Sequence, residues 1–200
     1  NYILNRSISC LVANKFKTSP QSPVGDSQPN VAQRICRINL LDSKGQVPTK
    51  SGLNWGKSNG KVVDGDAYLP IRVDYIRIFP DLFPQKKYVN GVINTNSLGK
   101  ITRENDVVEL IWDDKKSMIG LLEGTNTIDD VEYPNKLCSS NNKKELGDYI
   151  RERIEKKLGR DIFNASSIPL ITKDILQLYG RTHIDISKIA DGIYYLDFSV

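Results

Sequence analysis

The sequence predicts a mainly β domain with a few short helices, folded as a barrel-like or sandwich sheet rather than an α/β sheet. Three observations indicate this class. Segments in which apolar and polar residues alternate recur at residues 36–40, 183–187 and 194–200. Two apolar segments, residues 107–112 and 117–122, flank a short polar turn. Long polar stretches separate many of these segments, as is common in all-β folds.

Composition limits the classes of protein that fit. The 200 residues are 39% hydrophobic and 26% charged, with a net charge of +4. A chain of this size can bury a core without disulfides or a metal. The three cysteines are far apart and His183 is the one histidine, which disfavours a disulfide framework or a zinc site and suits a reducing cytoplasm. No signal peptide or membrane-length apolar run is present, so no membrane partner is expected.

The beginning of the chain differs from the rest. Residues 1–16 contain one apolar run, and residues 17–30 are rich in proline, serine and glycine, which is typical of a linker. The chain also starts without methionine. We therefore expect residues 1–30 to be the tail of an upstream domain with its linker, and residues 31–200 to form one folded domain.

The first elements of that domain are a strand, a shaped loop and a helix. The alternation at residues 36–40 predicts the strand. Residues 51–61 hold three glycines and one tryptophan, which indicates a long loop with a defined backbone shape. A short helix is predicted from Pro70 to Phe79, because proline suits a first helical turn and Pro80 stops the helix.

A hairpin, a second loop and a longer helix are predicted next. The strands at residues 107–112 and 117–122 form the hairpin. Residues 124–142 are polar and irregular, which predicts a long loop. Residues 143–158 have one apolar face and predict an amphipathic helix. Asn142 is expected to cap its start in a capping box, and Gly159 to close its end.

The last elements are a short helix and a hairpin. Thr172 is expected to cap the helix, which ends before Gly180. Residues 183–187 and 194–200 then alternate as two strands, and Asp191-Gly192 provides the turn between them.

Two patterns in the sequence are similar to catalytic motifs. Residues 52–58 imitate a phosphate-binding loop, but Ser51 stands where that motif needs glycine, so an NTPase is disfavoured. Asp81, Asp113 and Lys115 match a PD-(D/E)xK nuclease, in which two carboxylates hold a metal and a lysine orients water. A small metal-dependent nuclease therefore stays an alternative, although residues 113–116 also fit an ordinary solvated turn.

Both polar loops carry side chains that can bond to nucleic acid. Amides and hydroxyls can bridge groups on base edges, and lysines can reach guanine or phosphate. Two such loops on one barrel favour DNA, because paired arms can enter a major groove from both sides. The alternative is a pair of solvated loops. The candidates in the first loop are Lys50, Ser51, Asn54, Trp55, Lys57, Ser58, Asn59 and Lys61. Those in the second are Thr125, Asn126, Thr127, Asn135, Lys136, Ser139, Ser140, Asn141 and Asn142, and the phosphate candidates are Lys143, Lys144, Arg151 and Arg181.

Several separated motifs resemble one family in the same order along the chain. They are SGLNWG at residues 51–56, NGK at 59–61, AYLPI at 67–71, ELGDYIRER at 145–153, LYGRT at 178–182 and YYLDFS at 194–199. Together they resemble the C-terminal B3-like domain of NgoFVII- and NgoAVII-type restriction endonucleases, which is related to the EcoRII effector domain and the BfiI C-terminal domain. The resemblance covers about residues 36–200.

This resemblance implies a DNA-binding pseudobarrel, an open B3-like β-barrel. Two arms would grip double-stranded DNA at a short specific site in the major groove, the N-arm around residues 50–61 and the C-arm around residues 124–142. It implies a bacterial, cytoplasmic type II restriction endonuclease as the parent protein. This chain would contribute no catalytic residue, metal or cofactor. A B3-like transcription regulator is the remaining alternative.

The family's nuclease half is phospholipase D-like and uses a His-x-Lys motif. In this chain His183 is followed by Ile184 and Asp185, so the motif is missing. The resemblance therefore implies a nuclease domain upstream in the parent chain.

Overall fold

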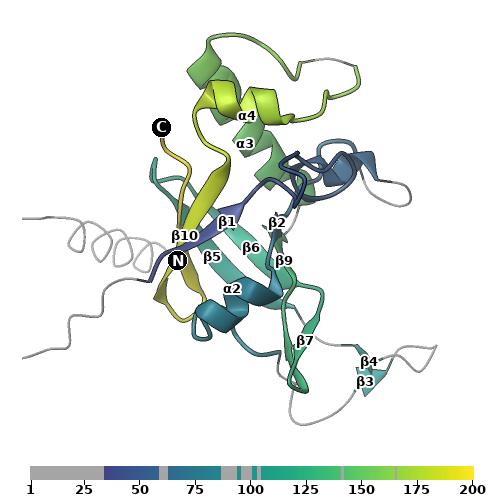
Figure 1. The fold of residues 1–200 in the computed structure, drawn as a ribbon, viewed down its shortest axis with the longest axis vertical. Helices are drawn as coiled ribbons and strands as arrows, with labels where there is room; N and C mark the ends of the chain where they lie inside the picture. Colours follow the sequence, from purple (N-terminus) through teal and green to yellow (C-terminus); the bar gives the residue numbers. More distant parts are fainter. Residues whose placement is uncertain are drawn as a thin grey trace, which may run out of the picture. The chain divides into compact units, whose positions relative to one another are not determined.

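A curved seven-stranded sheet is the main element of the computed structural model, which describes residues 34–58, 63–86, 94–95, 101–102, 105–140, 142–164 and 166–200. The strand order is β1-β10-β11-β5-β6-β9-β2 (Figure 1). The strands are β1 (Cys36–Asn39), β2 (Leu69–Pro70), β5 (Asp106–Trp112), β6 (Ser117–Glu123), β9 (Lys136–Ser139), β10 (His183–Ala190) and β11 (Ile193–Asp197). Neighbouring strands are antiparallel except β11 and β5, which are parallel. The predicted tail and linker at residues 1–30 lie outside the described residues.

Side chains join the two edge strands of this sheet, β1 and β2. Helix α2 (Val73–Ile78) follows β2, and the Tyr75 hydroxyl accepts a hydrogen bond of 3.0 Å from the Asn39 backbone N–H of β1. Arg72 donates a 2.7 Å bond to the Leu41 carbonyl, just beyond β1. The edges therefore lie close together without a strand ladder between them, and the predicted mainly β, open-barrel fold is confirmed.

The second polar loop is more regular than predicted. Besides β9, it contains the hairpin of β7 (Asn126–Ile128) and β8 (Val131–Tyr133). The prediction of an irregular loop over residues 124–142 was therefore wrong. The turn of the β7–β8 hairpin is Asp129-Asp130. Both residues have a positive φ, and they replace the Asn-Gly pair that usually marks such a turn. Another short pair, β3 (Asn94–Thr95) with β4 (Ile101–Thr102), precedes β5.

The helices agree with the sequence except at one boundary. Helix α3 (Lys143–Leu158) begins at the Asn142 cap and ends at Gly159, whose φ is +63°. Helix α4 (Lys173–Tyr179) is capped by the Thr172 hydroxyl and ends at Gly180. The predicted helix from Pro70 begins only at Val73, because Pro70 pairs with Lys136 in β9. Among the described residues, no helix combines the length and the apolar character that crossing a membrane requires.

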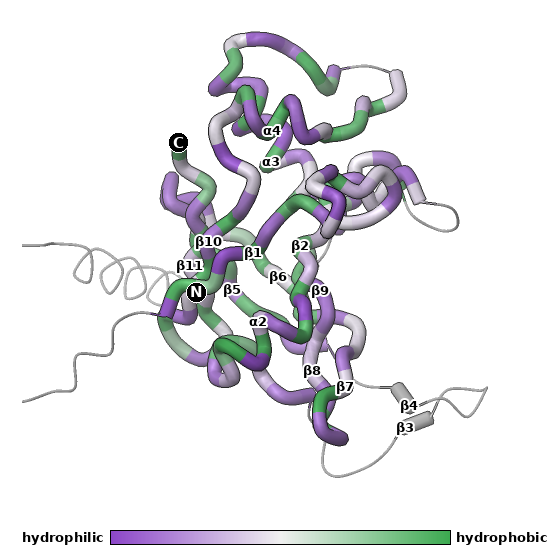
Figure 2. The backbone as a smooth tube through the Cα atoms, viewed as in Figure 1, coloured by the Kyte–Doolittle hydropathy of each residue, from purple (hydrophilic) through white to green (hydrophobic). Residues whose placement is uncertain are grey.

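The core fills the space between the sheet and the helices. Its fully buried residues include Ile38, Leu110, Ile150, Ile184 and Leu196, which come from β1, β5, α3, β10 and β11. Figure 2 shows hydrophobic stretches along the strands and more hydrophilic residues in the connecting segments. The first polar loop contains a 3-10 helix, η1 (Gly52–Lys57), which packs against the start of β2.

Candidate nucleic-acid interface

The two predicted arms adjoin opposite ends of the short strand β2. On the N-arm side, Gly52 O accepts a 3.1 Å hydrogen bond from the Tyr68 backbone N–H, just before β2. On the C-arm side, Asn126 donates a 2.8 Å hydrogen bond to the Ile71 carbonyl, just after β2. Figure 1 shows η1 and the β7–β8 hairpin on either side of β2 and β9. The N-arm and the β7–β8 hairpin of the C-arm are therefore attached at opposite ends of one short strand.

The N-arm has a backbone shape that requires glycine at two places. Gly52 has a φ of +59°, a conformation that side chains disfavour. At Gly56 an added Cβ would collide with the carbonyl of Val63, and the Gly56 N–H donates a 2.8 Å hydrogen bond to the Asp66 carbonyl. The close approach of residues 63–66 therefore explains Gly56, and the positive φ explains Gly52.

Asn54 lies inside the protein instead of facing a ligand. Its side chain is 1% exposed, and its amide nitrogen donates to the carbonyls of Pro48 at 3.0 Å and Ile171 at 2.8 Å. Its amide oxygen accepts a 2.9 Å bond from the Ile171 N–H. The expectation that Asn54 reads bases does not agree with this placement, because both ends of the amide are bonded within the protein.

Arg151, expected to contact phosphate, is also buried, with 5% of its surface exposed. Its guanidinium donates to the carbonyls of Gly65 at 3.0 Å and Leu53 at 3.2 Å, and burial lowers its pKa. Gly147, one turn earlier on α3, lets the helix approach Gly65 so closely that a Cβ would collide with it. Arg151 therefore ties α3 to the N-arm and is not available to a phosphate.

Lys57 forms contacts inside the protein as well. Its ammonium lies 2.7 Å from the Asp64 carboxylate and 3.0 Å from the Ser167 hydroxyl. Burial alone would raise the pKa of Asp64, but the Lys57 ammonium and the Ile168 backbone N–H outweigh it and hold that pKa below its ordinary value. Lys57 thus fastens the end of η1 to the segment that precedes α4.

One cluster of side chains, which we call the arm joint, connects the two arms. It consists of Trp55, Glu123, Lys136 and Lys143. The Glu123 carboxylate lies 2.9 Å from the Lys143 ammonium and 3.3 Å from that of Lys136. The same ammoniums lie 5.2 Å and 4.5 Å from the centre of the Trp55 ring, which also meets Tyr68 edge-on at 5.5 Å. Burial would raise the pKa of Glu123, but the two lysines outweigh it and lower that pKa.

Several C-arm candidates hold the arm in place. The amide of Asn135 donates to the Thr125 carbonyl at 3.1 Å, while Asn126 bonds to Ile71. Ser139 is buried and joins the Asn142 carbonyl to the Leu146 N–H. The side chains of Thr125 and Thr127 are exposed, and that of Ser140 is half-buried. Asn59, Lys61 and Asn141 lie outside the described residues.

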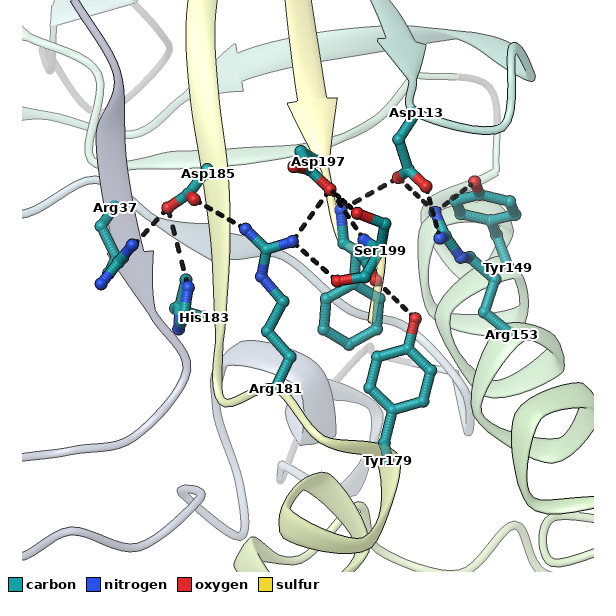
Figure 3. Close-up of polar contacts among 11 residues, drawn as sticks. Arg37, Asp113, Tyr149, Arg153, Tyr179, Arg181, His183, Asp185, Asp197 and Ser199 are labelled. Carbon is teal, nitrogen blue, oxygen red and sulfur yellow. Dashed lines mark hydrogen bonds and ion pairs between the residues drawn. The ribbon is translucent and has the colours of Figure 1, made fainter.

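Arg181 belongs to an ionic network on β10 and β11 (Figure 3). It lies 2.6 Å from Asp185 and 2.9 Å from Asp197, and it donates to the Ser199 carbonyl at 2.8 Å. His183 lies 3.9 Å from Asp185, and its pKa is lowered by burial and then by Arg37. These contacts pair Arg181 with two carboxylates and hold the last residues of the chain, and its expected role at a phosphate stays a prediction.

The remaining basic and polar candidates lie nearer to the surface. Lys50 is exposed and forms no hydrogen bond or ion pair within the described residues, and Lys144 lies 3.9 Å from Asp148. Ser51 and Ser58 are half-buried at the two ends of η1. A cavity of about 190 Å³ opens beside Ser51, between the N-arm, β1 and β2. Its lining combines apolar surface with the polar groups of Asn39, Ser51, Tyr68 and Arg72.

The three residues of the alternative nuclease site do not converge. The Asp113 carboxylate forms two bonds with Arg153, at 2.6 and 2.7 Å, and accepts a third from the Phe198 N–H near the end of β11 (Figure 3). Asp81 precedes Leu82, whose carbonyl accepts a bond from Tyr194 near the start of β11. Lys115 is exposed in a turn. Within the described part of the chain, acidic, histidine and cysteine side chains form no group of three suited to a metal.

Comparison with known proteins gives two results. Among curated proteins, no relative matches the chain. The family model described as the NgoFVII C-terminal B3-like DNA-binding domain matches residues 30–190, which is most of the chain. This match agrees with the open barrel and with the resemblance that the motifs predicted. The chain therefore belongs to the family of NgoFVII C-terminal B3-like DNA-binding domains, the DNA-binding modules of a restriction-enzyme family.

Proposed function

We propose that this domain recognises a short specific sequence in double-stranded DNA by placing its N-arm and C-arm in the major groove. In the parent protein it would be the target-recognition domain of a type II restriction endonuclease whose nuclease domain lies elsewhere. The pairing of the arms at the two ends of β2 carries this proposal. A two-stranded ribbon such as β7–β8 also has dimensions that a major groove admits.

The buried and the exposed arm residues have different roles in this proposal. Asn54 and Arg151 position the N-arm from within and are not part of the proposed contact surface. Lys50 is the proposed phosphate contact at the base of the N-arm. Ser58 and Thr127 are the proposed base or backbone contacts near the arm tips, because their hydroxyls lie at or near the surface. Asn59 and Lys61 continue the N-arm and stay proposed contacts.

Selection on a library of random duplexes tests the proposed function directly. The purified chain is expected to enrich one short sequence, and the enriched duplex becomes the cognate site for every later measurement. Specific binding is expected to exceed binding to random duplex by a factor of about 10³ or more. Enrichment of no sequence after repeated rounds would contradict sequence-specific recognition while leaving general DNA binding intact.

Thr127→Val and Lys50→Ala separate base reading from phosphate contact. Thr127→Val keeps the shape of the side chain and removes the hydroxyl, so it should weaken cognate binding by about 1–3 kcal/mol and spare random duplex. Lys50→Ala should weaken binding to all duplexes and reduce the slope of log K against log salt by about 0.9. Fluorescence anisotropy at several salt concentrations measures both effects.

Lys157→Ala is the matched control for Lys50→Ala. Lys157 is exposed in the last turn of α3, roughly 20 Å along the helix axis from Lys143, the first residue of the helix. Its removal should leave the salt slope within error of the wild-type value. If Lys157→Ala reduces the slope as much as Lys50→Ala, the arms are not the principal phosphate-binding surface.

A further inference from the structure

We propose that Glu123 is a positioning residue that sets the specificity of DNA binding. Its carboxylate holds the ammoniums of Lys136 and Lys143 on the face of Trp55, which couples the two arms and keeps both lysines from the phosphates of unrelated duplexes. This inference rests on the proposed function, since it concerns the same arms. The inference gives a role to an acidic residue on a surface that must approach the polyanionic DNA.

Glu123 occupies the point at which the C-arm leaves the sheet. It is the last residue of β6, and it lies opposite Lys136, the first residue of β9. Its carbonyl accepts a 2.9 Å hydrogen bond from the Asn135 N–H, and Gly124 then turns the chain outward with a φ of +67°. A change in the position of the Glu123 backbone would therefore move the whole stem of the C-arm.

Lys143 and Trp55 connect the same carboxylate to the N-arm. Lys143 begins α3 and bonds both oxygens of Glu123 at 2.9 Å. The Trp55 ring lies on η1 and faces both ammoniums, so each lysine has an anionic partner and an aromatic partner. Cation–π contacts of this kind attract an ammonium to the face of the ring, and more strongly where the pair is shielded from water. One carboxylate thus orients two cations that together brace the N-arm.

The charged side chains of the arm joint differ in how far they are exposed to solvent. The side chain of Glu123 is only 10% exposed, whereas those of Lys136 and Lys143 are 23% and 34% exposed. Two ammoniums and one carboxylate leave one positive charge in excess, and the two lysine side chains are the more exposed. A DNA strand between the arms therefore meets restrained lysines with the carboxylate beneath them.

This arrangement favours specific over general binding. Freely extended lysines bind the phosphates of any sequence, and each added phosphate contact steepens the salt dependence by about 0.9. Specificity is the difference between the cognate and the non-cognate affinity, so holding lysines back from non-cognate phosphates raises it. Arms held at a fixed separation also lose less conformational freedom when they bind their site.

The variant Glu123→Gln tests this role in the full chain. It removes the charge and keeps the size, so both lysines lose their anionic partner. Random duplex should be bound more tightly, with a salt slope steeper by about 1–2. The ratio of cognate to random affinity should fall about tenfold. A carboxylate that only stabilises the fold would predict weaker binding to both duplexes and an unchanged slope, and that result would overturn the proposal.

Asp130→Asn is the matched control. It removes the same charge from the exposed turn of the C-arm hairpin, and asparagine tolerates the φ of +62° at that position. Because no joint is broken, cognate and random affinities should rise together and their ratio should stay constant. A ratio that falls as far as in Glu123→Gln would show that charge alone is responsible, and would refute a positioning role.

Hydrogen exchange in the DNA-free protein tests the coupling independently of any target sequence. In Glu123→Gln, backbone amides of both residues 52–58 and residues 125–134 should exchange faster than in the wild type. Faster exchange in the C-arm alone would refute the coupling. This measurement stands even if selection finds no preferred duplex, so a failure of the proposed function is distinguished from a failure of this one.

Trp55→Leu is a second variant in case Glu123→Gln folds poorly. It removes the aromatic face that both lysines contact and leaves their carboxylate in place. The cognate-to-random ratio should fall, while the salt slope stays at the wild-type value because the lysines remain paired. An unchanged ratio in this variant would contradict the proposal as directly as the first test.

Discussion

At the scale of single residues, burial divides the polar side chains of the arms into two groups. Asn54 and Arg151 face inward and bond to backbone groups, while Lys50 and Thr127 face outward. The sequence cannot separate these groups, because the backbone groups to which the buried side chains bond include some that are far away along the chain. Ile171 is 117 residues from Asn54, and Leu53 is 98 residues from Arg151. A polar residue in a glycine-rich loop therefore predicts hydrogen bonding, but not with which molecule.

The variant Asn54→Ala tests the inward role. It leaves the Ile171 N–H and two backbone carbonyls without their partner, so it should lower the free energy of unfolding by about 2–4 kcal/mol. Urea denaturation measures this loss. Ser58→Ala, in the same arm but nearer the surface, should change it by less than about 0.5 kcal/mol. A stable Asn54→Ala protein that has lost its cognate preference would instead assign base reading to Asn54.

At the scale of elements, local signals decide what the sequence predicts correctly. The two main hairpins and the caps at Asn142 and Thr172 are all found, because adjacent residues specify each of them. The β7–β8 hairpin was missed because its strands are only three residues long and its turn lacks glycine. Strand β9 has three buried residues in succession, so it lacks the alternation that marks a half-exposed strand.

Replacing Asp129-Asp130 with Asn-Gly tests the turn of this hairpin. Both aspartates have a positive φ, +49° and +62°, which asparagine and glycine adopt more readily. The hairpin should become more stable by about 0.5–1 kcal/mol, because less strain opposes the turn. Slower hydrogen exchange over residues 126–133 would report this gain. Faster exchange would mean that the two carboxylates support the turn.

At the scale of the whole molecule, long-range pairing determines the sheet order. Strands β5 and β11 are parallel neighbours although about 80 residues separate them. No local sequence pattern predicts such a pair. The class of the fold follows from strand periodicity, and the open barrel followed from the family resemblance. The order of the strands and the position of the arms around β2 depend on contacts that only the folded chain contains.

Acid stability provides a test at this scale, because charged carboxylates bind separate segments together. Asp197 joins β11 to Arg181. Burial would raise its pKa, but Ser199 and Arg181 outweigh that effect and lower it. A lowered folded-state pKa means that the unfolded chain binds more protons in acid. The stabilisation is therefore complete above the unfolded pKa, near 4, and is lost as the pH falls through the folded value.

The melting temperature should fall only slightly from about pH 7 to 5, where the lowered pKa of His183 means that the unfolded chain binds this proton first, and it should fall steeply below about pH 4. Asp197→Asn should melt lower than the wild type at pH 7 and lose less on acidification. Scanning calorimetry over this pH range measures both. Equal losses in the two proteins would mean that Asp197 does not contribute to acid sensitivity.

The place of β11 has a consequence for how the protein is made. It is the last strand along the chain, yet it lies between β10 and β5 and joins the two halves of the sheet. Strand β1 pairs with β10, so β1 cannot join the sheet until nearly the whole domain has been synthesised. On the ribosome, the sheet stays in separate pieces until residues 193–197 emerge. The open barrel is thus completed only after translation of almost the entire domain, and the arms acquire their fixed spacing no earlier than that.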